Sequence, residues 1–334
     1  MKLFLAGDIG GTKTRLSLSE VNGEKVVTRR ETSYASQDHS SFNVLLKDFL
    51  SLGEKVADAA FGIAGPVLGE VAQATNLPWQ IDAAALRQEF GFMRCYLLND
   101  LEATAYGLPA LGEAGLWTLQ PGSSTQGNSA IIAAGTGLGE AGLYWDGSSH
   151  HPFATEGGHA TFSPRNPLEC ALLDYLRLRH SSIHISWERV VSGMGLLDLY
   201  GFLIDHRKAS TPPWLKDDMQ ATDKAAAISA AALSSRDDIC VETLQWFVSL
   251  YGAEAGNLAL KTMSRGGLYI GGGIAPKILP LLKSGEFLAS FLDKGRMRPL
   301  LEAMPIHIIL NDRAALYGPA LYAAQHAKTP SGSV

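Results

Sequence analysis

The stretch GDIGGT near the start of this sequence combines a carboxylate, two adjacent glycines and a hydroxyl, as Asp8, Gly10, Gly11 and Thr12. Glycine lets a turn bend tightly and lets a ligand approach the backbone, so several N–H groups can point in one direction. A turn of this kind can bind an anion through its N–H groups, and a phosphate group is the anion that fits it best. The Thr12 hydroxyl adds one more donor.

Asp8 needs its own explanation, because a carboxylate placed beside a phosphate is repelled by it. A divalent cation between the two removes the conflict, and Mg²⁺ typically binds few carboxylates together with waters and substrate phosphates. We therefore expect Asp8 to hold Mg²⁺ through a water molecule. Lys13 or Arg15 can add positive charge, and Arg15 can equally lie on the solvent face of a strand.

Two further glycine-rich stretches strengthen this interpretation, since one such turn alone is as typical of an ordinary tight hairpin. AAGTGLGEAG contains Gly135, Thr136 and Gly137 directly after an apolar run. YIGGGIAP contains Gly272 and Gly273 and leads into a helix, as a site for a nucleotide base or ribose does. None of the three matches a P-loop or a dinucleotide-binding fingerprint.

Asp100, in the stretch CYLLND, is the candidate general base for moving a phosphoryl group onto a hydroxyl. That reaction needs an acceptor for the hydroxyl proton. Asp100 stands at the C-terminal end of an apolar strand, where α/β folds bind ligands. Its neighbour Asn99 can both donate to and accept from sugar hydroxyls. The alternative is that the Asn-Asp pair only caps the following helix.

Glu156 and His159 flank two glycines in TEGGHATFSP. A metal pair is conceivable, but no second His or Cys stands at ligand spacing. A carboxylate and an imidazole can instead serve adjacent sugar hydroxyls. Glu188, in SWERVVSG, is expected at the start of a helix, where an acid also stabilises the helix dipole.

Short strands alternating with helices must position these residues. Strands are expected over residues 3–8, 14–20 and 24–30, followed by helix, strand, helix, strand and helix. The same order returns from Ser129 onward. This repetition predicts a duplicated βββαβαβα core in two lobes, with the first two glycine turns facing each other across a cleft. The alternative is a pair of ordinary α/β domains with tight hairpins.

Bulk properties narrow the class of protein. A chain of 334 residues is long for one core, which favours two lobes. A net charge of −5 argues against a general nucleic-acid or membrane surface. No apolar run approaches the ~20 residues of a membrane span. Three scattered cysteines and the lack of a leader-like N-terminus favour a reduced, cytoplasmic protein.

Six motifs in order along the chain resemble the bacterial glucokinase family, within the sugar-kinase, heat-shock chaperone and actin superfamily. They are GDIGGTKTR, LLNDLEA, AAGTGLGEAG, EGGH, WERVVSG and LYIGGGIAP. The resemblance implies a two-lobed ribonuclease-H-like fold. Its small lobe would comprise residues 1–108 and 304–334, with the first phosphate turn and the catalytic acid. Its large lobe would comprise residues 109–303, with the second phosphate turn and the sugar and adenosine sites.

The resemblance also implies ATP-dependent phosphorylation of glucose to glucose 6-phosphate, with Asp100 as general base, Mg²⁺ as cofactor and a homodimer as assembly. The implied glucose ligands are Asn76, Asn99, Asp100, Glu156, His159 and Glu188. The implied ATP ligands are Asp8, Gly10, Gly11, Thr12, Gly135, Thr136, Gly137, Gly272 and Gly273.

Two alternatives remain beside a glucose kinase. A kinase for another hexose keeps the same motifs, although the zinc-bearing branch of related sugar kinases is disfavoured because only Cys170 follows EGGH. A sugar-responsive regulator needs a DNA-binding segment ahead of Asp8, where seven residues stand. A nucleotide switch has no use for Asn99 and Asp100 together with EGGH. The role of Glu140, directly after the second turn, stays open: it points away from the phosphates or assists the metal.

Overall fold

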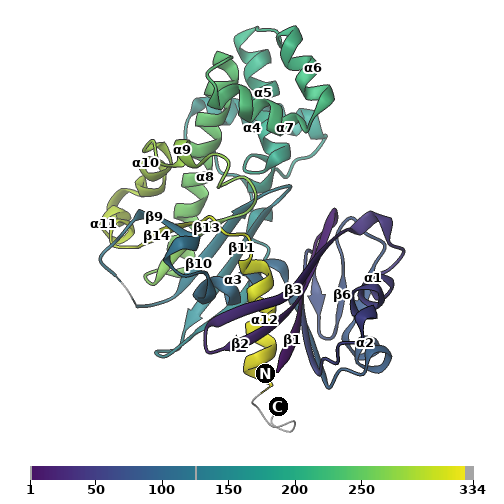
Figure 1. Cartoon of the computed structure of the whole chain (residues 1–334). Coiled ribbons are helices and arrows are strands. Elements are labelled where there is room, and N and C mark those ends of the chain that lie inside the picture. Colours follow the sequence, from purple (N-terminus) through teal and green to yellow (C-terminus); the bar gives the residue numbers. More distant parts are fainter. Residues whose placement is uncertain (1, 125, 328–334) are drawn as a thin grey trace. The chain divides into compact units, whose positions relative to one another are not determined.

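The computed structural model describes residues 2–124 and 126–327. The chain divides into two compact units, one formed by Met1–Leu116 with Asn311–Val334 and the other by Trp117–Leu310 (Figure 1). The family resemblance implied that the chain leaves the large lobe near residue 303. Strand β14 (Ile306–Ile309) instead pairs with β13 (Gly267–Gly271), so the chain stays in the second unit up to Leu310. Residues 328–334 of the predicted small lobe lie outside the described residues.

The first unit is built on a five-stranded sheet with the order β3-β2-β1-β4-β8. These strands are β1 (Leu3–Ile9), β2 (Lys13–Asn22), β3 (Lys25–Ala35), β4 (Asp58–Ile63) and β8 (Arg94–Asn99). β2 pairs antiparallel with β1 and β3, whereas β1, β4 and β8 run parallel. The carboxyl ends of the three parallel strands therefore meet at one edge of the sheet.

Side chains of β1 alternate between the two faces of this sheet. Leu5 packs into a core shared with helices α1 (Phe42–Phe49) and α2 (Ala83–Phe90). Phe4 points to the other face and packs with Ala323 and Ala324 of the C-terminal helix α12 (Ala314–His326). Helices therefore cover both faces of the sheet.

Helix α12 lies beside α3 (Asp100–Gly107), and both contact β4 (Figure 1). The two helices approach closely because glycine stands at the contact. A Cβ at Gly107 would overlap the carbonyl group of Ala314, and one at Gly318 would overlap the carbonyl group of Ala103. This packing fixes α3, and with it the acid at its start.

A small three-stranded sheet, which the sequence analysis missed, also belongs to the first unit. It consists of β5 (Val67–Leu68), β6 (Val71–Gln73) and β7 (Gln80–Asp82) in the order β5-β6-β7. Asn76 lies in the connection between β6 and β7 with a left-handed backbone, φ 63°. Asp82 at the end of this sheet caps α2, because it accepts hydrogen bonds from Ala84 N and Ala85 N.

The second unit contains a six-stranded sheet with the order β12-β11-β10-β13-β14-β9. The strands not yet given are β9 (Leu116–Gln120), β10 (Ser129–Ala134), β11 (Leu138–Trp145) and β12 (His150–Thr155). The antiparallel β10–β11–β12 arrangement mirrors β1–β2–β3 of the first unit. The expected repetition of three strands after an apolar start is thus confirmed.

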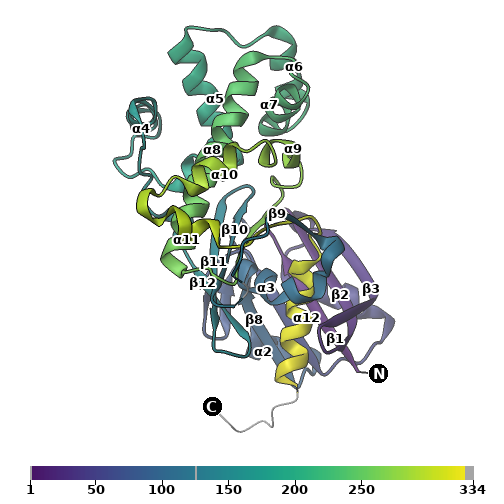
Figure 2. The same cartoon turned by 90° about the vertical axis from the view of Figure 1, so that its left-hand side faces the viewer.

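Eight helices of the second unit lie within the described residues: α4 (Pro167–His180), α5 (Gly193–Arg207), α6 (Pro213–Ala221), α7 (Lys224–Leu233), α8 (Asp238–Thr262), α9 (Leu279–Leu282), α10 (Glu286–Leu292) and α11 (Arg298–Glu302). The long helix α8 packs on β10, while α5, α7 and α10 pack on α8 (Figure 2).

One predicted helix starts later than expected. The sequence analysis placed the helix start at Glu188, but α5 begins at Gly193 and a separate 3₁₀ turn spans Trp187–Arg189. The reason is a cap, because Ser192 Oγ accepts a hydrogen bond from Gly195 N and closes the first turn there. Glu188 is therefore not a first-turn acid of α5.

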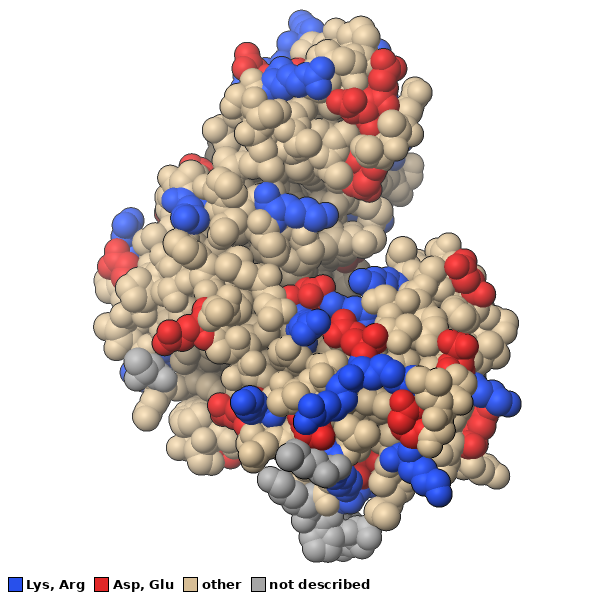
Figure 3. All heavy atoms as spheres, viewed as in Figure 1, with Lys and Arg blue, Asp and Glu red and all other residues tan. Residues whose placement is uncertain are grey.

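The described residues contain no helix both long enough and apolar enough to cross a membrane. On the face drawn in Figure 3, Lys and Arg side chains are interspersed with Asp and Glu over both units.

Candidate functional site

The first glycine turn joins β1 to β2. Gly10 N donates to Lys13 O at 3.0 Å, which closes the turn. A Cβ at Gly11 would lie 3.0 Å from Thr75 O and 3.2 Å from Asn76 Cβ. Glycine is needed here for close approach, and neither Gly10 nor Gly11, both among the described residues, adopts a left-handed backbone. The turn and Asn76 are thus brought together.

Asp8 is held by Arg15 across the β1–β2 pair. Asp8 Oδ2 accepts from Arg15 Nε at 3.2 Å and from Nη2 at 2.9 Å, and Arg15 Nη1 donates to Asp312 Oδ2 at 2.7 Å. Burial raises the pKa of Asp8 above its ordinary value, while the Arg15 guanidinium opposes that rise. Arg15 is therefore the counter-charge of Asp8, and its lying on a solvent face is excluded by an exposed fraction of 8%.

Whether Asp8 suits Mg²⁺ depends on the donors around it. Within the described residues, no three His, Cys, Asp or Glu side chains gather closely enough to hold a metal ion on their own. Mg²⁺ does not need such a cage, since it keeps most of its waters and shares substrate phosphates. The Asp8 side chain stays 24% exposed beside the glycine turn, so one carboxylate and a phosphate fit the ion's requirements.

Asn99 and Asp100 stand at the same edge of the first sheet as Asp8. Ile63 of β4 pairs with both Ile9 and Asn99, which aligns the ends of β1, β4 and β8. Asn99 caps α3, because its Oδ1 accepts from Leu101 N at 3.1 Å. Asp100 is the first residue of α3, and its Oδ1 also accepts from Leu101 N, at 2.9 Å.

The second glycine turn joins β10 to β11 and is held by neighbouring segments. Gly135 N donates to Gly137 O at 2.8 Å, and Gly193 N at the start of α5 donates to Gly135 O at 2.8 Å. A Cβ at Gly272, which has φ 84°, would overlap the carbonyl group of Ala134. The turn, the start of α5 and the third glycine-rich stretch therefore meet at one end of the second sheet.

Glu188 lies directly against this second turn. Its Oε2 accepts from Leu138 N at 3.0 Å, and a Cβ at Gly137 would overlap the same carboxylate. The predicted sugar ligand is thus fixed by the backbone that follows the turn. Ser192 Oγ donates to Glu188 O at 2.7 Å and locks the segment from the other side.

Glu156 and His159 come together as expected from their spacing. Gly157–His159 forms a 3₁₀ turn, and Glu156 Oε2 lies 3.9 Å from His159 Nε2. Both side chains are open to solvent, with 75% and 59% exposed, so both can reach a ligand. His184 Nε2 donates to His159 O at 3.1 Å, a support that sequence reasoning missed.

Two supporting residues differ in whether the sequence carries a signal for them. Tyr251 of α8 is fully buried, with its hydroxyl 3.2 Å from Ile132 O and 3.3 Å from Gly271 O, and it accepts from Ala134 N at 3.3 Å. An aromatic residue inside an apolar helix does not announce that contact. Ser192 before Gly193 did carry a signal, since serine is a preferred N-cap.

Glu140 turns into the interior, which answers the question left open by the sequence. It is 2% exposed on β11, and its carboxyl group lies beneath Gly157. It does not point toward solvent at the second turn.

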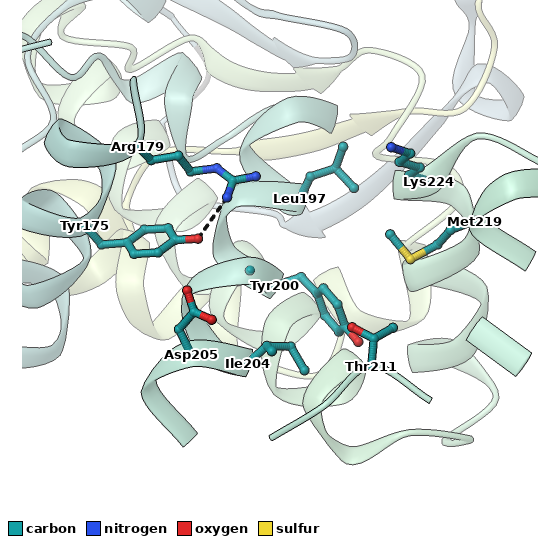
Figure 4. Close-up of a pocket in the computed structure, with 10 residues that line it drawn as sticks. Tyr175, Arg179, Leu197, Tyr200, Ile204, Asp205, Thr211, Met219 and Lys224 are labelled. Atoms are coloured by element: carbon teal, nitrogen blue, oxygen red, sulfur yellow. Dashed lines mark hydrogen bonds between the residues drawn. The ribbon is translucent and has the colours of Figure 1, made fainter. Parts of the chain in front are cut away.

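A separate cavity of about 300 Å³ lies among α4, α5, α6 and α7 of the second unit (Figure 4). Tyr175 and Arg179 line one side of it and are joined by a hydrogen bond of 3.1 Å. None of the predicted site residues, all of which the structure describes, lines this cavity.

The sequence profile of glucokinases matches residues 5–326. The chain belongs to the glucokinase family. A glucokinase of Trichormus variabilis is 46% identical over 97% of this chain and 100% of its own length. A glucokinase of Synechocystis is 42% identical over 96% of this chain and 98% of its own length. The predicted family is thereby confirmed.

Solved glucokinases share the fold. A glucokinase from an Antarctic psychrotroph superimposes with a TM-score of 0.85 at 29% identity, over 97% of this chain and 99% of that one. A ROK-family glucokinase from Streptomyces griseus, solved with glucose and AMPPNP, superimposes with a TM-score of 0.64 at 22% identity, over 97% and 99% of the two chains. The predicted two-lobed, actin-like ATPase fold is confirmed.

Proposed function

We propose that this glucokinase-family chain transfers the terminal phosphoryl group of ATP to the 6-hydroxyl of glucose, giving glucose 6-phosphate and ADP. The observation that carries the proposal is the position of Asp100, at the carboxyl end of β8 beside Asn99, in a chain that matches the family over residues 5–326. Membership of the glucokinase family indicates that the reaction is phosphoryl transfer. Asp100 supplies the proton acceptor that this reaction needs.

Asp100 acts as the general base. As the sugar oxygen forms its bond to phosphorus, the proton of that hydroxyl passes to the Asp100 carboxylate, and the bond between the terminal phosphorus and ADP breaks. Two features support this role: Asp100 is fixed at the start of α3 by Leu101 N, and Asn99 already supplies the helix cap. The cap alone therefore does not explain why an acid follows Asn99.

Glucose is held by side chains that can form hydrogen bonds. The proposed ligands are Asn76, Asn99, Asp100, Glu156, His159 and Glu188. Sugar hydroxyls both donate and accept, so carboxylates, amides and an imidazole suit them. Glu156 and His159 support this assignment best, because both side chains are exposed and lie 3.9 Å apart.

ATP is held by the three glycine-rich turns. The N–H groups and Thr hydroxyls of Gly10, Gly11, Thr12, Gly135, Thr136 and Gly137 serve the phosphates, and Gly272 with Gly273 serves the adenosine. Asp8 would hold Mg²⁺, which would supply positive charge to the phosphates when bound. The exposed part of the Asp8 carboxylate supports this, while Arg15 keeps the carboxylate in place.

A homodimer and a cytoplasmic location stay predictions that rest on the resemblance and on the cysteine usage of the sequence. Light scattering of the purified chain tests the dimer directly.

A coupled assay of ADP release tests the proposed function. ADP should appear on addition of glucose, MgCl₂ and ATP, and the sugar product should be oxidised by glucose-6-phosphate dehydrogenase. Mannose and fructose at equal concentration serve as controls for the hexose. ADP release that does not depend on glucose would indicate a nucleotide switch, and faster turnover of another hexose would indicate a different sugar kinase.

A further inference from the structure

Glu140 and Glu254 form a buried acidic pair in the second unit. Glu140 lies on β11 and Glu254 in the middle of α8, and their exposed fractions are 2% and 0%. The two side chains lie within hydrogen-bonding reach of each other. Carboxylates only accept hydrogen bonds, and two buried negative charges repel strongly, so this contact requires a proton on one of them.

The surroundings decide which residue carries the proton. Glu254 Oε2 accepts from Asn257 Nδ2 at 2.7 Å, and its Oε1 lies 3.5 Å from Lys261 Nζ. Lys294, whose Nζ donates to Ala253 O at 3.0 Å, adds a further positive charge. The Oε1 atoms of Glu140 and Glu254 are both buried with no hydrogen-bond partner among the described residues. A proton on Glu140 lets its carboxyl group donate to Glu254.

The pKa values agree with that geometry. Burial, and then the charge of Glu254, raise the pKa of Glu140 to about 8. The pKa of Glu254 is also raised by burial, but Asn257 and Lys261 oppose the rise. Glu140 is therefore the partner that keeps a proton near neutral pH.

Glu140 also packs directly against the turn that carries Glu156 and His159. A Cβ at Gly157 would overlap the Glu140 carboxyl group. Thr155 Oγ1 donates to Glu140 O at 2.8 Å and accepts from Gly157 N at 3.3 Å, so the turn is tied to the same residue through its backbone. The Glu140 side chain cannot move toward Gly157 without displacing the turn.

We propose that Glu140, through the proton it shares with Glu254, is a positioning residue that holds the Glu156–His159 turn in the geometry that binds glucose. This inference rests on the proposed assignment of Glu156 and His159 to the sugar. When Glu140 loses its proton, two charged carboxylates face each other in the interior. Glu140 then swings away from Glu254, the turn shifts, and glucose affinity falls while ATP affinity does not.

Other charged and titratable groups face the Glu140–Glu254 pair, and their effects on glucose binding must be distinguished from that of Glu140. Lys261 is the positive partner of Glu254 on α8, and Tyr251 of the same helix stays neutral because burial raises its pKa. Burial lowers the pKa of Lys294, which is also influenced by Arg165 and Asp293. Lys294 is therefore the second group here that can titrate at alkaline pH, and a change at Glu140 alone distinguishes the two.

The test measures the glucose dissociation constant by calorimetry without ATP, from about pH 6 to about pH 9.5, in wild type and in Glu140→Gln. Glutamine is neutral at every pH, and its amide can still donate to Glu254. Wild type should keep constant affinity up to neutral pH and lose about tenfold above it, the effect of losing one hydrogen bond to a charged group. Glu140→Gln should remain flat. Glu286→Gln, the same exchange at an exposed position of the second unit, should behave as wild type.

The outcomes are distinguishable. An alkaline loss that persists in Glu140→Gln, or a wild-type affinity that does not change with pH, would overturn the inference and leave the proposed function intact. A wild type that binds no glucose at neutral pH would instead overturn the proposed function. If Glu140→Gln does not fold, Gly157→Ala replaces it: its methyl group presses on Glu140, so glucose affinity should fall at neutral pH and the ATP KM should not change. Unchanged glucose affinity in Gly157→Ala would contradict the inference.

Discussion

The two glycine turns each join a pair of antiparallel strands, and they differ in the acid beside them. In the first unit, Asp8 is partly exposed and its charge is matched by Arg15. In the second unit, Glu140 is buried, and its partner is another acid, Glu254. A charge that is paired and reachable can serve a cation, whereas a buried acid that keeps its proton serves packing.

The same contrast extends to the acids that face the ligands in our proposal. In that proposal, Asp100 of the first unit, held at a strand end at the start of α3, takes the proton. Glu156 of the second unit, exposed beside His159, binds the sugar. On this proposal, position and pairing, more than residue type, separate an acid that reacts from one that holds a ligand.

The largest effect is expected from Asp100→Asn. Asparagine keeps the shape of the side chain and can still bind glucose, but it cannot take the proton. Turnover should fall by roughly 10²–10⁴, the range typical of losing a positioned base. Steady-state kinetics measures this, with Glu102→Gln in the same helix as control. If Asp100 were only a helix cap, turnover would be kept and a thermal melt would show at most a small shift, since Asn caps about as well.

Asp8→Asn comes next and tests the first-unit side of the comparison. Removing the charge should weaken the response to Mg²⁺ and lower turnover by roughly tenfold, the size of one lost charge-assisted contact. Glucose binding should be nearly unchanged. Titrating activity with MgCl₂ measures the effect. Glu140→Gln, which alters the buried acid, should leave the Mg²⁺ response as in wild type, and equal shifts in both variants would break the comparison.

Glu156→Gln tests the second-unit side. Removing a carboxylate that accepts from sugar hydroxyls should cost about 1–3 kcal/mol of glucose binding. The ATP KM should change much less. Calorimetric titration with glucose, beside kinetics with varied ATP, measures both. Equal losses for the two ligands would mean that Glu156 is structural.

The smallest effect concerns stability and pH. The pKa of Glu140 lies at about 8 in the folded protein against 4.5 as its ordinary value, so the folded state holds a proton that the unfolded chain releases earlier. The contribution of Glu140 to the free energy of unfolding should therefore be largest below pH 4.5 and fall as pH rises from 4.5 to about 8. Glu140→Gln should flatten this decline by a few degrees of melting temperature. Parallel melts across this range check the result, and identical declines in both proteins would refute it.

The sequence predicted local elements well where caps and breakers are close by. Helix α4 begins at such signals, because Asn166 caps it and Pro167 is its first residue. The apolar strand before the second turn matches β10, Ser129–Ala134, because glycine ends it. Such signals act over a few residues and are visible in a single sequence.

What the sequence could not predict are contacts between distant segments. Arg15 pairs with Asp312, 297 residues later, and neither residue carries a mark of the other. The partner of Glu140 lies on α8, in the middle of an apolar helix. The residue types of the candidate site could therefore be predicted from the sequence. The neighbouring residues that set their charge and position could not.

One measurement tests most directly whether Asp100 is the acid that reacts and Glu156 the acid that binds glucose. It determines glucose affinity and turnover on the same preparations of Asp100→Asn and Glu156→Gln. The account predicts opposite patterns. Asp100→Asn should bind glucose within a few-fold of wild type and barely turn over, whereas Glu156→Gln should bind glucose weakly and turn over at saturating sugar. Wild-type turnover in Asp100→Asn, or the same pattern in both variants, would contradict the account.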